Sequence, residues 1–151
     1  MKKSVLKPEL NWLSNPEVFR VNRMDAHSDH TYYRDGEEAK EKETSFRYDL
    51  NGIWKFHYAR NYGSAISGFE KEEYCCRDWD DIRVPAHIQM EGYDAPQYAN
   101  VQYPWEGHED IHPGEIPEHF NPVASYVKYF TVPEQMKGKR LFISFQGAES
   151  G

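Results

Sequence analysis

Residues 54–58 alternate between aromatic and polar side chains. Trp54, Phe56 and Tyr58 fall on one side of an extended chain, and Lys55 and His57 fall on the other. Side chains of a β-strand alternate between its two faces, whereas a helix places like residues three or four positions apart. This period of two therefore predicts a strand with one buried face, and a fold built on a sheet.

Three further segments have the composition of strands: 81–85, 125–133 and 140–145. The first is short and ends at a proline, and the other two are rich in β-branched and aromatic residues and are separated by a turn-like stretch. Strand candidates at wide spacing, without alternating helices, predict an all-β sandwich.

The expected domain boundary lies near residue 45. Residues 1–45 are polar and irregular, with a charged run at 37–42 that suits one short helix, and we expect an N-terminal arm here. A jelly-roll sandwich needs about eight strands, more than 46–151 provides. We therefore expect 46–151 to be the first part of a truncated sandwich. The apolar anchors of the arm would be Trp12, Leu13, Val18, Phe19 and Val21.

Such a truncation has an expected physical consequence. It would leave one edge of 140–145 unpaired and would uncover the core faces of Trp54, Phe56, Phe130 and Phe145. We therefore expect the isolated chain to be poorly soluble, to self-associate through strand exchange, or to be a partly molten monomer.

Composition and charge exclude several classes of partner. The formal net charge is -7, so the chain lacks the positive surface that nucleic acids and anionic membranes require. Aromatic residues make up 15% of the chain. A ring can pack in a core or stack on a sugar, and for any single ring packing in the core is the usual role. No segment is long and apolar enough to span a membrane. The only cysteines, Cys75 and Cys76, are adjacent, and no Asn-x-Ser/Thr sequon occurs, which predicts a cytoplasmic protein.

Common catalytic motifs are missing from the sequence, including Gly-rich phosphate loops, Gly-x-Ser-x-Gly, Cys-x-x-Cys and His-Glu-x-x-His. Residues 108–119 gather several His, Asp and Glu side chains, but their spacing matches no metal template and we interpret the segment as an exposed polar loop. No pair among the 25 acidic residues stands out for glycoside hydrolysis. Cys75 lies in no activating motif, so we expect a buried or half-buried thiol.

The most specific motif lies in the proline-rich stretch 86–124, which is long enough to be a functional loop. Residues 92–104 read Gly-Tyr-Asp-Ala-Pro-Gln-Tyr-Ala-Asn-Val-Gln-Tyr-Pro. They resemble the motif Gly-Tyr-Asp-x-Pro-x-Tyr-x-Asn-x-x-Tyr-Pro of glycoside hydrolase family 2, in the long β-galactosidases of the bacterial lactose-operon type. Flanking segments are similar in the family's order, so the resemblance covers nearly the whole chain: Asn15-Pro16, Asn22-Arg23, Ala26-His27, 50–56, Val84-Pro85 and 126–145.

The resemblance implies a galactose-binding-like jelly-roll domain at the amino end of an enzyme that hydrolyses terminal β-D-galactosides, such as lactose, by a retaining mechanism. In that family an immunoglobulin-like domain and a β/α barrel follow, and the barrel carries both catalytic glutamates. We therefore expect no catalytic residue in this chain and no activity from it alone. For the whole enzyme the resemblance implies Mg²⁺ and Na⁺ as cofactors and a homo-oligomer.

For the site, the resemblance implies that Asn100 binds the terminal galactose and that Val101 lines the same wall. An amide suits this role because it both donates hydrogen bonds to hydroxyls and accepts them. From the residues alone, capping a turn between Pro96 and Pro104 is the simpler role for Asn100.

The chain departs from the family pattern at two places. Asn15 and Val18 resemble positions near a structural metal in some members, but the acidic residue that precedes them is replaced around Asn11, so we assign no metal ligand. At 87–89 the sequence His-Ile-Gln stands where many relatives have Trp-Gln, which removes an aromatic ring.

Two other functions stay open. A stand-alone carbohydrate-binding module could use the same sandwich, although a secreted module would normally carry an export signal rather than a polar arm. A β-glucuronidase or β-mannosidase of the same family would keep the Leu-x-Gly-x-Trp-x-Phe pattern of 50–56 but not the Gly-Tyr-Asp-Ala-Pro run.

Overall fold

The computed structural model describes residues 9–96, 100 and 105–148. It forms two compact units: the first holds the described residues up to His27 together with Asn51–Lys128, and the second holds Ser28–Leu50 with the described residues from Tyr129 on. In chain order the elements, with η for a 3-10 helix, are η1 Leu10–Ser14, α1 Gly36–Glu41, β1 Gly52–Ala59, η2 Tyr62–Ser64, β2 Asp80–Val84, η3 Ile88–Glu91, β3 Val123–Val127 and η4 Glu134–Met136.

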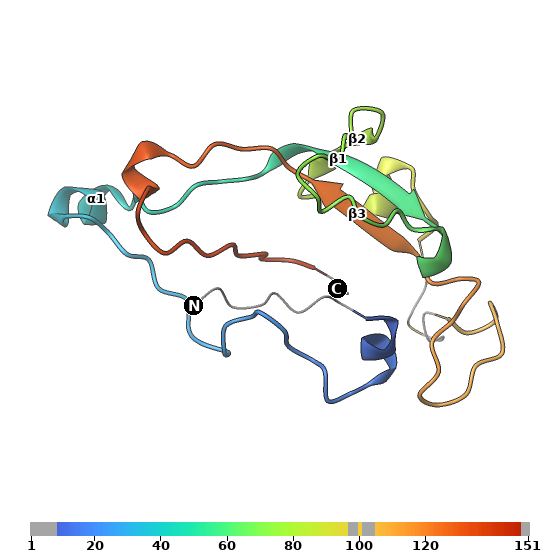
Figure 1. Cartoon of the computed structure of the whole chain (residues 1–151). Coiled ribbons are helices and arrows are strands. Elements are labelled where there is room, and N and C mark those ends of the chain that lie inside the picture. Colours follow the sequence, from blue (N-terminus) through green and yellow to red (C-terminus); the bar gives the residue numbers. More distant parts are fainter. Residues whose placement is uncertain (1–8, 97–99, 101–104, 149–151) are drawn as a thin grey trace. The chain divides into compact units, whose positions relative to one another are not determined.

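The first unit is built on an open antiparallel sheet of three strands in the order β2-β1-β3 (Figure 1). In this register Phe56 of β1 lies opposite Asp80 of β2 and Tyr126 of β3. The strands predicted at 54–58 and 81–85 are confirmed, as is the mostly-strand character of the fold. The closed jelly-roll sandwich stays a prediction.

The aromatic face predicted for 54–58 packs around Phe56, which is 0% exposed. The ring of Tyr126 meets the Phe56 ring at 4.9 Å and the Trp54 ring at 6.4 Å between centroids, edge-on in both cases. Ile82 lies on the same face, opposite Trp54, and is 1% exposed. Burying a side chain of this size contributes about 1.5–3 kcal/mol, and an edge-on ring pair adds about 0.5–1.5 kcal/mol. This face is the core that holds the three strands together.

The opposite face of β1 is covered by Trp79, which is nearly buried. Its ring lies 5.5 Å from the ring of His57 and 5.8 Å from that of Tyr74. Lys55 Nζ donates to the carbonyl oxygen of Trp79 at 3.1 Å and pairs with the Asp81 carboxylate at 2.9 Å. Because Lys55 and Asp81 are also cross-strand partners, this ion pair favours the observed register of β1 and β2.

The two adjacent cysteines lie in different environments. Cys76 is 2% exposed, whereas Cys75 is exposed. The expectation of a buried or half-buried Cys75 thiol is therefore wrong. Consecutive side chains of an extended segment point in opposite directions, so when one of the pair faces inward the other faces water.

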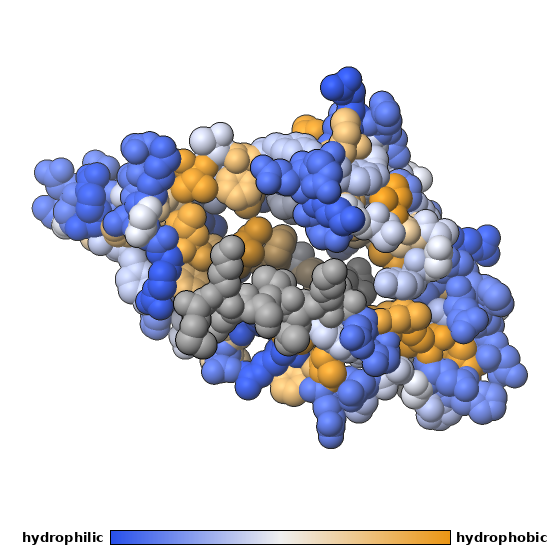
Figure 2. Space-filling model, in the orientation of Figure 1, coloured by the Kyte–Doolittle hydropathy of each residue, from blue (hydrophilic) through white to orange (hydrophobic). Residues whose placement is uncertain are grey.

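The strand predicted at 140–145 is wrong: this segment has no strand structure, although every residue in it is described. A strand needs a neighbour that satisfies its backbone groups, and a β-prone sequence alone cannot supply one. Its large apolar side chains are 52–68% exposed: Leu141, Phe142, Ile143 and Phe145. Apolar side chains are also visible among polar ones on the surface shown in Figure 2.

The strand predicted at 125–133 is partly confirmed. β3 begins at Val123, earlier than predicted, and ends at Val127. Lys128 then uses its Nζ to donate to the carbonyl oxygen of Ile53 at 2.8 Å. Of the core faces that truncation was expected to uncover, Phe130 is 51% and Phe145 68% exposed. The expectation is wrong for Phe56, because the rings around it and β2 bury it completely.

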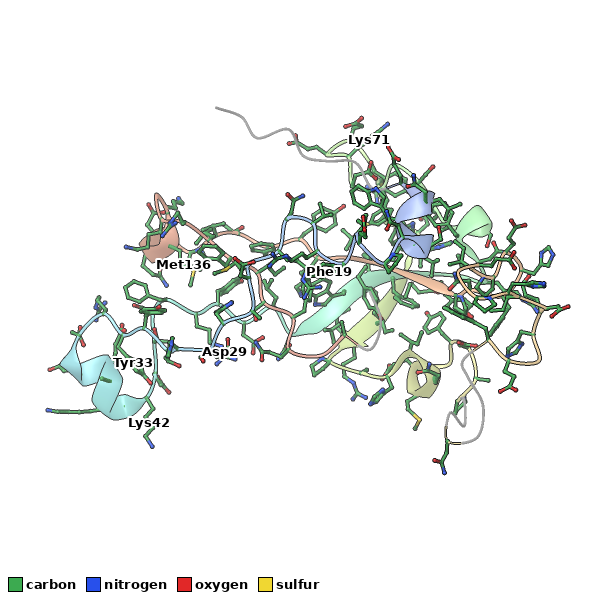
Figure 3. The ribbon with its side chains drawn as sticks, turned by 90° about the horizontal axis from the view of Figure 1, so that it is seen from below. Phe19, Asp29, Tyr33, Lys42, Lys71 and Met136 are labelled. Carbon is green, nitrogen blue, oxygen red and sulfur yellow. The ribbon has the colours of Figure 1, made fainter. Side chains whose placement is uncertain are left out.

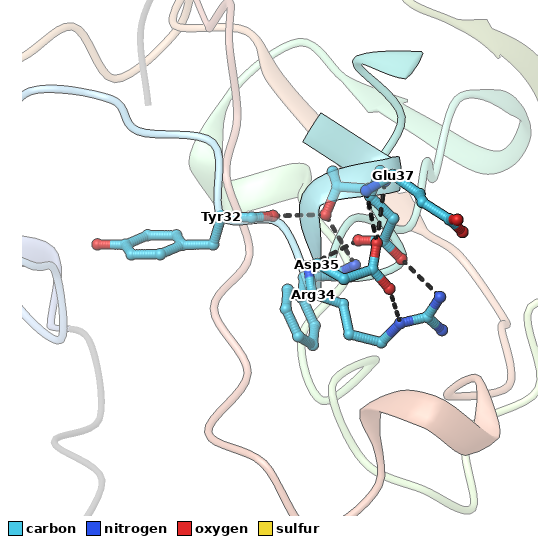
Figure 4. Close-up of polar contacts among 7 residues, drawn as sticks. Tyr32, Arg34, Asp35 and Glu37 are labelled. Atoms are coloured by element: carbon cyan, nitrogen blue, oxygen red, sulfur yellow. Dashed lines mark hydrogen bonds and ion pairs between the residues drawn. The ribbon is translucent and has the colours of Figure 1, made fainter. Parts of the chain in front are cut away.

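The second unit contains α1, which confirms the predicted short helix. Asp35 caps its amino end by accepting hydrogen bonds from the backbone N–H groups of Glu37 and Glu38, each at 3.0 Å (Figure 4). The bond from Glu38 is the main cause that lowers the pKa of Asp35. Thr44 Oγ1 donates to the carbonyl oxygen of Tyr32 at 2.6 Å, which joins the segments that precede and follow the helix.

The apolar contacts of the second unit are few and partly exposed. Met136 in η4 is 7% exposed, and Figure 3 labels it together with Lys42, the residue after α1. The rings of Tyr48 and Phe130 lie 6.2 Å apart, and Lys139 Nζ lies 5.4 Å from the centre of the Phe46 ring. Little apolar surface is buried here, so we expect this unit to be less stable than the sheet.

In the predicted arm, the described residues before α1 begin at residue 9. The one regular element among them is η1. Trp12, Val18 and Val21 are half-buried, whereas Leu13 is 57% and Phe19 70% exposed. The arm and its boundary at residue 45 stay predictions. Within the described ranges, no helix has the length and apolar character needed to cross a membrane.

Replacing Ile143 by lysine should reduce self-association of the chain. The exposed apolar side chains at 141–145 form a strand-prone surface, and a charge within it makes pairing between copies unfavourable. Sedimentation velocity at matched concentrations measures the effect. Ile53→Lys, at an isoleucine that is 58% exposed but lies in β1, is the control. If Ile143→Lys sediments like the original chain, the segment is not the site of association.

Candidate functional site

The segment that leads to Asn100 begins with a tight turn after η3. Gly92 follows η3 with a φ of 95°, a left-handed value that L side chains rarely adopt. The Tyr93 N–H then donates to the carbonyl oxygen of Ile88 at 3.1 Å. Glycine at this position thus lets the chain reverse and bring Tyr93 back onto the sheet.

Tyr93 packs on the aromatic face of β1. Its ring meets the Phe56 ring at 4.5 Å, at an angle of 63°, and lies 6.2 Å from the Tyr58 ring. Its hydroxyl donates to Asp80 Oδ2 of β2 at 2.9 Å. Burial, followed by this hydrogen bond and the nearby charges of Asp80 and Glu91, raises the pKa of Tyr93 to about 12. Tyr93 therefore remains a hydrogen-bond donor throughout the physiological pH range.

Asp94 makes a second contact with the same strand. Its backbone is left-handed, with a φ of 58°, a conformation that aspartate tolerates better than most residues. Its carboxylate lies near the Tyr58 hydroxyl. Burial first, and then the charge of Asp94, raises the pKa of Tyr58, against the opposing effect of Arg60. Tyr93 thus contacts β1, and the Asp94 carboxylate lies near the Tyr58 hydroxyl of the same strand.

The segment after the motif returns to the end of the same strand. The Asn121 N–H donates to the carbonyl oxygen of Arg60 at 3.1 Å, and Asn61 Nδ2 donates to the carbonyl oxygen of His119 at 3.3 Å. The ring of Phe120 stacks on that of His108 at 3.9 Å and 23°. The Arg60 guanidinium lies 5.9 Å from the centre of the Phe120 ring. Residues 108–121 are therefore held to the residues that directly follow β1.

Of the two predicted site residues, the structure describes one. Asn100 is exposed and lies in a turn, a position compatible both with sugar binding and with the simpler turn-capping role. Val101 lies outside the described residues. Their predicted roles stay predictions.

A metal site is not apparent in the described ranges, where no three His, Cys, Asp or Glu side chains lie close enough together to hold an ion. The polar side chains of 108–119 make local bonds, such as that from the His119 N–H to Glu109 Oε1 at 3.1 Å. Asn15 Oδ1 accepts from the Glu17 N–H at 3.0 Å. The described side chains do not make a fitting set for a metal, and the expected Mg²⁺ and Na⁺ stay predictions for a whole enzyme.

Sequence reasoning missed Tyr58, Asp80, Tyr93 and Asp94 as a connected group. Tyr93 and Asp94 were part of the recognised motif, but nothing in their spacing indicated contacts with β1 and β2. The available signal was the alternation of 54–58, which places Tyr58 on the face that Tyr93 covers. The contacts of this group hold Tyr93, near the start of the motif, against the sheet.

Comparison with known proteins agrees with the motif. Residues 47–151 match the model of the sugar binding domain of glycosyl hydrolases family 2. The chain is 54% identical over 142 residues to a beta-galactosidase of Halalkalibacterium halodurans, covering 93% of this chain and 14% of that protein. It is 49% identical over 145 residues to a beta-galactosidase of Clostridium acetobutylicum, covering 95% and 16%.

A beta-galactosidase large subunit of Latilactobacillus sakei is 37% identical over 156 aligned residues, covering 95% of this chain and 25% of that subunit. The chain thus spans a quarter or less of the length of each of these relatives. The resemblance predicted from residues 92–104 is confirmed at the level of the family.

Raising the pH from about 10 to about 12 should lower the free energy of unfolding through Tyr93. The pKa of Tyr93 is about 12 in the folded chain and near 10, the ordinary tyrosine value, in the unfolded chain. The stability that this difference contributes is fully present below pH 10 and is lost as the pH rises through about 12. Urea unfolding across this range measures the loss, which should be smaller in Tyr93→Phe. Tyr62→Phe, at a tyrosine that is 52% exposed, is the control. Identical profiles for the original chain and Tyr93→Phe would contradict this.

Proposed function

The chain belongs to glycosyl hydrolase family 2, and we propose that it is the sugar-binding portion of a β-galactosidase. The observation that carries the proposal is the 54% identity to a beta-galactosidase across 93% of the chain. Tyr93, which belongs to the motif that carries this likeness, is bound to Asp80 of β2 and packs on Phe56 of β1.

In this proposal the chain contributes binding and not bond making. The Asn100 amide would hydrogen-bond hydroxyls of the terminal galactose that do not react, and Val101 would line the same wall. Binding energy from such groups can orient a sugar at catalytic residues supplied elsewhere. Asn100 is an exposed residue in a turn, which supports this role.

The chemical step would belong to the whole enzyme. A retaining glycosidase uses one carboxylic acid to protonate the leaving oxygen and a carboxylate to attack the anomeric carbon, and water then releases the sugar from the enzyme. We place both glutamates outside this chain. The proposed substrates are terminal β-D-galactosides such as lactose.

The same proposal covers the wider architecture. The open sheet β2-β1-β3 would be one part of a jelly-roll sandwich formed by 46–151 and further strands, with 1–45 as an arm. The whole enzyme would be a cytoplasmic homo-oligomer.

Sequencing the gene beyond codon 151 tests the proposal directly. A downstream β/α barrel with two catalytic glutamates supports it, and an in-frame stop codon soon after this point overturns it in favour of a stand-alone module. A barrel whose whole protein cleaves β-glucuronides or β-mannosides, and not β-galactosides, would instead assign the chain to another enzyme of the family.

The chain by itself should hydrolyse no chromogenic β-galactoside above background, because neither catalytic glutamate is expected within its 151 residues. Release of nitrophenol by the purified chain is the measurement. Heat-inactivated chain and a mock purification are the controls. Hydrolysis that co-purifies with the chain through successive columns would refute the expectation.

In the whole enzyme, Asn100→Ala should weaken transition-state binding of galactosides by about 1–3 kcal/mol, the usual cost of leaving a buried partner group unpaired. The ratio kcat/KM measures the effect. Gln135→Ala removes an exposed amide in the second unit and should leave kcat/KM unchanged. Unchanged kinetics in Asn100→Ala would return Asn100 to the turn-capping role.

A further inference from the structure

A buried nitrogen of β1 takes no part in the proposed function. The Nδ1 atom of His57 is shielded from solvent and has no hydrogen-bond partner in the described structure. Buried polar atoms are almost always hydrogen-bonded, because an unpaired one has lost its hydration without compensation. Side chains alternate along a strand, so His57 lies on the face of β1 opposite Phe56. Packing on that face therefore includes a titratable side chain with an unpaired atom.

The segment 60–79, which joins β1 to β2, packs back on His57 through a layer of aromatic rings. We call the Trp79 layer the four rings that meet here: His57, Phe69, Tyr74 and Trp79. The Trp79 ring lies 5.5 Å from the rings of His57 and Phe69, between centroids. The segment also brings two titratable groups, the Tyr74 hydroxyl, which accepts from Trp79 Nε1 at 3.3 Å, and the buried Cys76 thiol. His57 is the member of the layer that belongs to the sheet.

The charged groups on this face of β1 and β2 are already paired with one another. Lys55 lies on the same face as His57, two residues before it, and its Nζ binds the Asp81 carboxylate of β2 at 2.9 Å. Further along β2, Arg83 pairs with Glu91 at 3.0 Å. Among the described ion pairs none includes His57. The Lys55 ammonium therefore makes a second positive charge on this face unfavourable.

The other elements packed against His57 bring no described charge to its ring. On β3 the residue opposite His57 is Ser125, which is 5% exposed. The charged side chains of the segment are all in exposed residues: Glu70, Lys71, Glu72, Glu73, Arg77 and Asp78. The surroundings of the ring thus suit an uncharged imidazole.

We propose that His57 makes the packing of the segment 60–79 on β1 sensitive to acid. A neutral imidazole has one nitrogen without a hydrogen, whereas a protonated imidazole carries an N–H on both nitrogens. Protonated His57 would place a charged donor at Nδ1, where the described structure provides no acceptor. Burying an unpaired charged donor is much less favourable than burying an unpaired neutral acceptor. The protonated ring is therefore more stable in water, and the segment opens to release it.

The direction and size of the pH effect follow from the form that binds the proton. The opened form exposes the imidazole, and an exposed histidine takes up a proton near about pH 6.5. Because the packed form takes it up less readily, packing is fully favoured above this range and is weakened as the pH falls through it. If only the opened form is protonated, opening becomes about tenfold more frequent between about pH 7.5 and about pH 5.5.

This sensitivity does not depend on galactoside binding, because His57 and Tyr93 lie on opposite faces of β1. Amide hydrogen exchange of the full chain, followed by mass spectrometry at about pH 7.5 and about pH 5.5, measures it. After correction for the intrinsic pH dependence of exchange, the protection of peptides from 68–79 should fall about five- to tenfold. Peptides from β1 should keep their protection.

Two substitutions at His57 remove the titratable group. His57→Phe keeps a ring against Trp79, and His57→Gln keeps a polar side chain, so a packing defect specific to one of them does not affect the other. In both variants the fall in protection at low pH should disappear. The compared quantity is the change with pH, so a variant that packs less well at every pH still gives an answer.

His108→Phe is the matched control. The His108 ring also lies against an aromatic ring, that of Phe120 at 3.9 Å, but His108 is exposed and lies outside the Trp79 layer. Its replacement should leave the five- to tenfold fall in 68–79 unchanged, within about twofold.

Three outcomes overturn the proposal. The first is a protection of 68–79 that does not change with pH in the original chain. The second is a fall of equal size in both His57 variants, which would assign the effect to another group. The third is a parallel loss of protection in β1, since acid would then unfold the whole sheet and not release the segment alone.

Discussion

The complete burial of Phe56 is the constraint on which the first unit depends. Its ring meets Tyr126 of β3 and Tyr93 of the motif, and its backbone position lies opposite Asp80 of β2. One aromatic side chain therefore links all three strands and Tyr93, near the start of the motif. Because the sheet is narrow, few other groups can take over this role: of the large side chains described, only Ile82 is buried as fully. The start of the motif and the stability of the sheet thus depend on the same core.

Much of this core could be predicted from local sequence. Alternation over 54–58 depends only on neighbouring residues, so it predicted both the strand and the buried face of Phe56. The helix at α1 was predictable for a similar reason, since Asp35 and the charged residues after it suit a capped helix. The candidate site was less accessible. The motif pointed to Asn100, but the bond from Tyr93 to Asp80 joins the segment after η3 to β2, and no local sequence pattern indicates that these two residues meet.

The failed predictions share a physical cause. Residues 140–145 have strong β-propensity, yet a strand forms only where a neighbouring strand pairs with it. The described structure offers this segment no such neighbour. The exposure of Cys75 and the burial of Cys76 likewise depend on which side of the segment faces the interior, and the sequence of the pair alone does not determine this. Local pattern predicts what a segment can form, and tertiary contacts decide whether it does.

The reactivity of the two adjacent thiols can report how often the structure around them opens. Cys75 meets an alkylating reagent directly, whereas Cys76 can react only when the surrounding chain moves away. Since the two are neighbours in sequence, their intrinsic reactivities are compared at nearly the same position. The ratio of their alkylation rates therefore converts into the free energy of local opening beside the Trp79 face, with no added label and no change to the sequence.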